Sequence, residues 1–145
     1  MPERTATAQW EGSTRDGGGN VALGSGAFEG PYTFKSRFGS ERSSSTNPEE
    51  LLGAAHAACF TMALSLFLSE GGTPPERLDT QAKVSIVQDG EGFTIDRIAL
   101  TTRGRVPDID EDGFQKAAQG AKENCPVSKA LGAVPEITLD ATLET

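Results

Sequence analysis

The sequence has few cysteines, and this scarcity limits the kinds of protein it encodes. Two cysteines in 145 residues are too few for a secreted scaffold held together by disulfides. In a reducing compartment, a pair of thiols is more often catalytic, redox-sensing or incidental than structural. Cys59 and Cys125 are therefore the first candidates for function.

Positive charge is also scarce. Thirteen Lys and Arg stand against 21 Asp and Glu, and the formal net charge of −8 repels nucleic-acid backbones and anionic lipid headgroups. The opening MPERTATAQW lacks the apolar core of a signal peptide. We also expect no run that approaches the roughly eighteen uncharged apolar residues of a membrane span. These absences predict a cytoplasmic protein that binds neither nucleic acid nor membrane.

Length and patterning predict one α+β domain over residues 1–145. The hydrophobic content of 36% and charged content of 23% are typical of a soluble globular chain. Segments with alternating or turn-bounded patterns, which predict strands, are residues 5–14, 21–23, 32–34, 78–87, 93–106 and 136–143. Segments that predict helices are residues 47–70 and 110–124, with a short helix from 125. The Ser-rich residues 39–46 predict a polar loop.

The first predicted helix has an apolar middle. Asn47 can cap it, Pro48 suits its first turn, and Glu49 and Glu50 oppose the positive end of the helix dipole. The stretch LLGAAHAACFTMALSLFL that follows is apolar nearly all round and rich in small residues. We therefore expect this helix to be central, buried on every face and able to approach another helix closely.

The residues alone leave open which thiol reacts. Cys59 lies in the middle of the predicted buried helix, where burial raises a thiol pKa, so it needs an opposite charge and a route to substrate. Cys125 occupies the cap of a helix, where backbone N–H groups favour a thiolate. From position alone, Cys125 is the more acidic of the two.

His56 is the single histidine and lies three residues before Cys59. It could act as a weak general base or a metal ligand, although packing is the favoured role. A zinc site built on one histidine and two cysteines would need carboxylates or ligands from a second subunit. We expect neither a metal nor another cofactor.

Several segments together resemble the OsmC/Ohr family of osmotically inducible and organic hydroperoxide resistance proteins. The two longest are NPEELLGAAHAACFTMALSLFL and NCPVSKAL. AQWEG, PYTFKSRF, GFTIDRIAL and EITLD extend the likeness over nearly the whole chain in collinear order. The resemblance is stronger to the OsmC branch. It implies an OsmC-like fold, in which antiparallel sheets pack around a central helix, and an intertwined homodimer.

The resemblance also implies a cysteine-based peroxidase active in oxidative and osmotic stress. Cys59 attacks an organic hydroperoxide and becomes a sulfenic acid, and Cys125 resolves it as a disulfide. Arg37, oriented by Glu49, holds the Cys59 thiolate, which agrees with the ability of a fixed guanidinium to stabilise a thiolate. Arg15 is the reserve candidate, because the segment Thr14 to Gly17 resembles the arginine-bearing loop of the Ohr branch.

The remaining expectations concern substrate, partners and alternatives. An apolar pocket is expected to include aromatic and other apolar side chains near the thiols: His56, Phe60, Met62, Phe67 and Phe93. The family's use of dihydrolipoyl groups makes a lipoylated protein the expected dithiol reductant. Two alternatives stay open: a redox sensor that uses the same disulfide as its signal, and an osmotically induced binding or structural dimer with little peroxidase flux.

Spacing along the first long helix bears on the homodimer. Ten residues separate Glu49 from Cys59, which places their backbones roughly 15 Å apart along the axis at the α-helical rise. A glutamate side chain does not span that distance. We therefore predict either that Arg37 bridges it within one chain, or that Cys59 and the Arg37–Glu49 pair come from different subunits, and we favour the second arrangement.

Overall fold

The computed structural model describes residues 2–39 and 44–144. Within these residues the chain forms six strands and four helices, which is the predicted α+β class. The chain divides into two compact units, Met1–Leu51 and Leu52–Thr145. The single domain over residues 1–145 stays a prediction.

The first unit contains a three-stranded antiparallel sheet in the order β1-β2-β3. Its strands are β1 (Ala6–Glu11), β2 (Gly18–Leu23) and β3 (Glu29–Tyr32). The register pairs Ala8 with Val21, and Val21 in turn with Gly30. The predicted hairpin is therefore confirmed, although its second strand begins at Gly18, three residues earlier than expected.

A short helix, α1 (Phe34–Phe38), follows the third strand. The expectation that Tyr32, Thr33 and Phe34 continue the sheet was wrong beyond Tyr32. Thr33 caps the helix instead: its hydroxyl accepts the Ser36 N–H at 3.0 Å, and the Ser36 hydroxyl accepts the Thr33 N–H at 2.8 Å. This reciprocal capping box stops the strand and starts the helix.

The predicted polar loop, residues 39–46, lies partly outside the described residues, because the description omits 40–43. Its last residue, Thr46, is buried and forms an isolated parallel bridge with Tyr32. The Thr46 carbonyl also accepts the Ser36 hydroxyl at 2.7 Å. The end of this segment is therefore held in the fold rather than being a solvated linker.

Helix α2 (Pro48–Glu70) has the predicted bounds. The Asn47 side chain accepts the Glu50 N–H at 2.7 Å, which is the predicted cap. The helix ends before Gly71 and Gly72, and Gly72 adopts a φ of +87° that glycine tolerates. Local signals at both ends thus set the length of this helix.

Helix α2 is not buried on every face within one chain, so that expectation was wrong. Phe60, Leu64 and Leu68, four residues apart, are buried. On the other side, Met62 is 76% exposed and Leu66 56%. The reason is that, within the second unit, the sheet and the other helices pack against the side of α2 that carries Phe60, Leu64 and Leu68.

The expectation of no membrane-length apolar run was also wrong. By length and composition alone, α2 is long and apolar enough to cross a membrane, with a mean hydropathy of 1.8 in its most apolar window. The core helix of a non-membrane protein meets the same two conditions, so the property does not assign α2 to a membrane.

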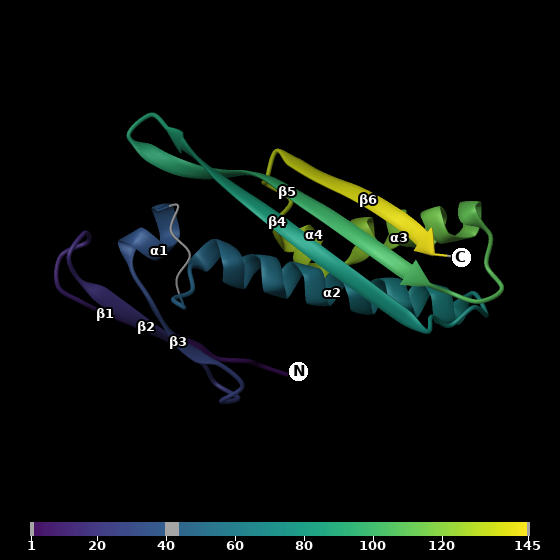
Figure 1. Ribbon diagram of the computed structural model, residues 1–145, viewed down its shortest axis with the longest axis horizontal. Helices are drawn as coiled ribbons and strands as arrows, with labels where there is room; N and C mark the ends of the chain where they lie inside the picture. Colours follow the sequence, from purple (N-terminus) through teal and green to yellow (C-terminus); the bar gives the residue numbers. More distant parts are fainter. Residues whose placement is uncertain (1, 40–43, 145) are drawn as a thin grey trace. The chain divides into compact units, whose positions relative to one another are not determined.

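The second unit contains the other three-stranded sheet, in the order β4-β5-β6. Strands β4 (Arg77–Asp89) and β5 (Gly92–Arg105) form the predicted antiparallel hairpin, and β6 (Glu136–Glu144) pairs with β5 in parallel. The expectation of antiparallel sheets was therefore wrong for this sheet, which is mixed. A parallel pair needs a crossover connection. Helices α3 (Glu111–Asn124) and α4 (Pro126–Ala130) supply it, as Figure 1 shows.

The core of the second unit lies between the sheet and its helices. On β5, Ile98, Leu100 and Thr102 alternate toward the helices and are buried, while Thr101 and Arg103, at the alternate positions, are exposed. The buried hydrophobic residues are Phe60, Leu64 and Leu68 of α2; Ile98 and Leu100 of β5; Val106, which directly follows β5; Phe114, Ala118 and Ala121 of α3; and Cys125. This core fixes α2 and the start of α4 beside one another.

Candidate functional site

Two thiols meet where α2 and α4 approach each other. Cys59 lies near the middle of α2, and Cys125 is the residue that immediately precedes α4. Neither forms a disulfide. Hydrogen bonding between the two thiols affects the pKa of both, so their sulfur atoms are close. The fold therefore brings together two cysteines that are 66 positions apart in the sequence.

The pKa values of the two thiols are shifted in opposite directions. Burial raises the pKa of Cys59, and the neighbouring Cys125 raises it further. Burial alone opposes a thiolate at Cys125 as well, but hydrogen bonding from Cys59 and from Ser128 outweighs it, so the pKa of Cys125 is lowered. Cys125 makes no regular side-chain capping bond, yet the N–H groups of Val127 and Ser128 contribute to the lowering. The sequence-based expectation that Cys125 is more acidic is confirmed.

An apolar groove of about 720 Å³ opens beside Cys59. Residues of α2 form most of its wall, with a contribution from the junction of α3 and α4: Ala55, Ala58, Cys59, Met62, Ala63, Leu66, Phe67, Asn124 and Pro126. Cys125 is not among them and is 0% exposed. Only Cys59 of the two thiols therefore faces this groove.

The side chains predicted to form the pocket are dispersed. Met62 and Phe67 line the groove. Phe60 and His56 are fully buried and do not line it, and Phe93 is 52% exposed at the start of β5 beside the hairpin turn. The groove thus includes two of the five expected residues.

His56 has a buried polar partner that sequence reasoning did not single out. Its Nε2 lies 2.7 Å from the hydroxyl oxygen of Ser128, in α4. His56 is 0% exposed and Ser128 is 8% exposed, and burial lowers the pKa of His56. The position of Ser128 three residues after Cys125 was the available signal, because residues three apart lie on one helix face.

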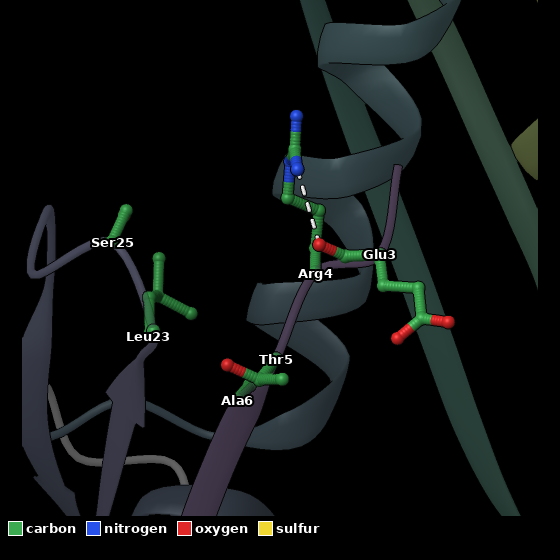
Figure 2. A pocket seen from close by; sticks show the side chains of 7 residues that line it. Glu3, Arg4, Thr5, Ala6, Leu23 and Ser25 are labelled. Atoms are coloured by element: carbon green, nitrogen blue, oxygen red, sulfur yellow. Dashed lines mark hydrogen bonds between the residues drawn. The ribbon is translucent and has the colours of Figure 1, made fainter. Parts of the chain in front are cut away.

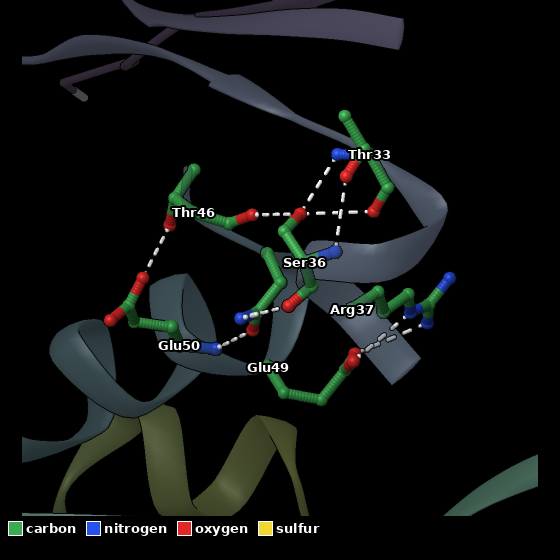
Figure 3. Close-up of polar contacts among 7 residues, drawn as sticks. Thr33, Ser36, Arg37, Thr46, Glu49 and Glu50 are labelled. Atoms are coloured by element: carbon green, nitrogen blue, oxygen red, sulfur yellow. Dashed lines mark hydrogen bonds and ion pairs between the residues drawn. The ribbon is translucent and has the colours of Figure 1, made fainter. Parts of the chain in front are cut away.

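Arg37 and Glu49 form an ion pair in the first unit. Arg37 Nε donates to Glu49 Oε1 at 3.0 Å, and Nη2 donates to Oε2 at 3.1 Å, so the pair is bidentate (Figure 3). The Glu49 side chain is 8% exposed and that of Arg37 is 39% exposed. Hydrogen bonds among neighbouring side chains, including Asn47 to the Ser36 carbonyl at 3.0 Å, tie α1 to the start of α2.

The reserve arginine lies against the same short helix. The Arg15 guanidinium sits 4.8 Å from the centroid of the Phe34 ring, and that of Arg37 sits 5.1 Å from the Phe38 ring. The two rings are 5.0 Å apart. No carboxylate among residues 2–39 and 44–144 pairs with Arg15. The fold therefore orients Arg37 with a carboxylate and Arg15 with an aromatic ring only.

Two cavities in the first unit contain no thiol. One of about 280 Å³ has Arg37 in its wall, together with Trp10, Thr14, Tyr32, Thr33, Phe34 and Phe38. Another, of about 630 Å³, lies between the start of β1 and the end of β2 (Figure 2). The Arg4 guanidinium there donates to the Glu3 carbonyl at 3.1 Å. The side chains that line this second cavity include hydroxyl groups and the Glu3 carboxylate but no thiol.

Metal-binding groups are dispersed in the described part of the chain, where no cluster of three or more His, Cys, Asp or Glu side chains occurs. The candidate catalytic residues instead form two pairs. Arg37 pairs with Glu49 in the first unit, and Cys59 pairs with Cys125 in the second.

Comparison with known proteins gives consistent matches. Residues 40–140 match the family model described as OsmC-like protein. The chain is 50% identical over 139 residues to peroxiredoxin OsmC of Escherichia coli, covering 95% of this chain and 94% of that protein. It is 31% identical over 102 residues to the organic hydroperoxide resistance protein OhrB of Bacillus subtilis, covering 69% and 72%.

A solved structure has the same fold. The organic hydroperoxide resistance protein of Elizabethkingia anophelis superposes with a TM-score of 0.77 at 26% identity, over 97% of this chain and 96% of that one. The likeness thus includes the α+β fold as well as the sequence. By its family-model match and by its identity to the relative from E. coli, this chain belongs to the OsmC-like protein family.

Proposed function

We propose that this chain is a thiol peroxidase that reduces organic hydroperoxides, with Cys59 as the peroxidatic residue. One observation carries the proposal: two unbridged, interacting thiols lie beside an apolar groove that reaches Cys59. The names of the relatives, peroxiredoxin OsmC and organic hydroperoxide resistance protein, support the same chemistry. The expected setting is defence against oxidative and osmotic stress in the cytoplasm.

The proposed reaction has three steps. The Cys59 thiolate attacks the terminal oxygen of the hydroperoxide, the O–O bond breaks, and the leaving alkoxide takes a proton to become an alcohol. Cys59 is thereby oxidised to a sulfenic acid, which condenses with the Cys125 thiol to form a disulfide and water. A dithiol then reduces the disulfide, and we expect a lipoylated protein to supply it.

Access assigns the two thiols their proposed roles. A peroxidatic thiol must meet the hydroperoxide, and Cys59 lines the groove while Cys125 is fully buried. The buried thiol remains close enough to attack the oxidised one. The predominantly apolar lining of the groove favours a hydroperoxide with a hydrocarbon substituent over hydrogen peroxide, because burying that substituent is favourable.

Cys59 needs a cation to react, because burial and its neighbour Cys125 raise its pKa. We propose that Arg37 is this cation and that Glu49 orients it. The bidentate pair occupies Nε and Nη2, which leaves Nη1 without a hydrogen-bond partner among residues 2–39 and 44–144. A guanidinium held in this way can stabilise the thiolate and donate to the peroxide oxygens.

We further propose that the protein is a homodimer in which Arg37 of one subunit serves Cys59 of the other. The exposed apolar residues of α2, which include Met62 and Leu66, give a second subunit an apolar surface to cover. Exposed apolar patches of this kind mark interaction sites in soluble proteins.

The first experiment distinguishes the roles of the thiols. Cys59→Ser and Cys125→Ser variants receive one equivalent of cumene hydroperoxide and then a sulfenic-acid probe. Cys125→Ser should be labelled, because its sulfenic acid has no resolving partner, and Cys59→Ser should not. The unmodified protein should form an intramolecular disulfide. Labelling of Cys59→Ser alone would reverse the two roles.

The second experiment measures turnover and separates the enzyme from the alternatives. Steady-state rates with cumene hydroperoxide and with hydrogen peroxide are compared, first with dihydrolipoamide and then with thioredoxin as reductant. The peroxidase proposal expects rapid turnover of the organic substrate with dihydrolipoamide. Slow turnover without preference for the organic substrate would favour a redox sensor, and absence of thiol oxidation would favour a binding or structural dimer.

A further inference from the structure

A second contact joins α2 to α4 beside the thiol pair. His56 precedes Cys59 by three residues on α2, and Ser128 follows Cys125 by three residues. Residues three apart share a helix face, so the His56–Ser128 contact of 2.7 Å runs alongside the contact between the thiols. Two of these four side chains, His56 and Ser128, have no part in the three proposed steps.

The Ser128 hydroxyl has two polar neighbours. It lies 2.7 Å from Nε2 of His56. It also lies three residues after Cys125, the N-cap residue of the same short helix, and lowers the pKa of that thiol by hydrogen bonding. A hydroxyl carries one proton and accepts through its oxygen, so it can accept a proton on one side while donating on the other. The contacts therefore form a continuous chain from the Cys125 sulfur through the Ser128 oxygen to the imidazole.

The imidazole is suited to receive a proton. Burial lowers the pKa of His56 and so keeps the ring neutral. A neutral ring has one protonated and one unprotonated nitrogen. When Nδ1 carries the proton, Nε2 is free to accept one from Ser128. The buried Nδ1 has no hydrogen-bond partner in the described part of the chain, so no neighbour there fixes the opposite tautomer.

We propose that His56 and Ser128 form a proton relay for the resolving thiol, Cys125. The inference rests on the proposed peroxidase function and adds two positioning residues to it. As the Cys125 sulfur attacks the Cys59 sulfenic acid, the S–H proton moves to Ser128 while the Ser128 proton moves to His56 Nε2. The S–S bond forms, the S–O bond breaks, and the departing hydroxide takes a proton from solvent, which reaches Cys59 through the groove, to leave as water.

The same relay serves the reduction of the disulfide in the opposite direction. When a thiolate of the dithiol reductant attacks Cys59, Cys125 is the leaving group and departs as a thiolate. The proton held on His56 then returns through Ser128 to Cys125. Cys125 itself is 0% exposed, so the relay rather than bulk water carries the Cys125 proton at both steps.

The test separates the two oxidation steps. Four variants are compared with the unmodified protein. Ser128→Ala removes the hydroxyl and Ser128→Thr retains it. His56→Gln retains a polar side chain but lacks a nitrogen basic enough to accept the proton, and Thr61→Ala is the control. Thr61 is a partly buried hydroxyl of α2 that bonds to Thr80 at 2.7 Å. Stopped-flow mixing with one equivalent of cumene hydroperoxide follows sulfenic-acid formation and then disulfide formation.

Disulfide formation should slow by about tenfold or more in Ser128→Ala and in His56→Gln, because a hydrogen bond to a charged group has an effect of that order. The double variant should be no slower than the slower single variant, since both changes interrupt one chain of contacts. Ser128→Thr and Thr61→Ala should resolve at close to the unmodified rate. Unchanged disulfide formation in both Ser128→Ala and His56→Gln would overturn the relay.

A separate measurement does not depend on peroxidase activity. In a Cys59→Ser background, the alkylation rate of Cys125 by iodoacetamide is followed against pH, with and without Ser128→Ala, in protein shown to be folded by its thermal unfolding. Loss of the hydroxyl should shift the titration of Cys125 to higher pH. If peroxide fails to oxidise Cys59 but this shift occurs, the peroxidase proposal fails while the Ser128–Cys125 contact stands. If the shift is absent, the relay fails.

Discussion

Replacing Arg37 with alanine tests whether a guanidinium activates the Cys59 thiol. The substitution removes both hydrogen bonds to Glu49, of 3.0 and 3.1 Å, together with the charge proposed to stabilise the thiolate. Loss of one preorganised donor at a developing charge typically lowers a rate by about 10²- to 10³-fold. We expect the rate of Cys59 oxidation to fall by that order, and the pKa of Cys59 to rise further.

The cost to folding should be small by comparison. A hydrogen bond to a charged group contributes about 1.5–3 kcal/mol when it is buried. The Arg37 side chain is 39% exposed, so solvent screening reduces the contribution of this pair toward about 1 kcal/mol or less. Activity and stability should therefore separate, with a large loss of rate in a protein that remains folded.

The assay measures the rate constant for oxidation of Cys59 by cumene hydroperoxide, in parallel with chemical unfolding. Arg15→Ala is the matched control, because Arg15 contacts Phe34 on the same short helix but has no carboxylate partner in the described residues. Its rate should be close to that of the unmodified protein. Glu49→Gln should give an intermediate loss, since it retains the shape of the orienting group without its charge. Inactivity of Arg15→Ala with an active Arg37→Ala would refute the assignment.

Two further predictions concern assembly and pH. Co-refolding inactive Cys59→Ser with inactive Arg37→Ala should restore activity, because a mixed dimer contains one complete site if the thiol and the guanidinium come from different chains. Verified heterodimers that lack activity would show that the site lies within one chain. His56 has a lowered pKa in the folded protein, so its contribution to stability is fully present above its usual pKa of 6.5 and is lost as pH falls through the folded value. Denaturant unfolding between about pH 8 and pH 5 should therefore show stability declining below the usual value, with a smaller decline in His56→Gln.

Local signals in the sequence were enough for most secondary structure. Asn47 predicted the start of α2, because its side chain can satisfy a free N–H group whatever the tertiary context. The position of Cys125 at the start of α4 likewise predicted its acidity, although the side chain of Ser128 and the thiol of Cys59 also contribute to it. The same local reasoning failed at Thr33, where a strand was expected and a capping box formed.

Contacts between distant segments were decided only by the tertiary structure. Nothing local relates His56 to Ser128, 72 positions away, yet the packing of α2 beside α4 brings them to 2.7 Å. The same packing buries Cys125 while leaving Cys59 on the groove. The sequence by itself thus determined the long elements, the cap of α2 and the two candidate thiols, because these depend on neighbours along the chain. Which side chains meet, and which thiol faces the groove, depended on how the helices pack on the sheet.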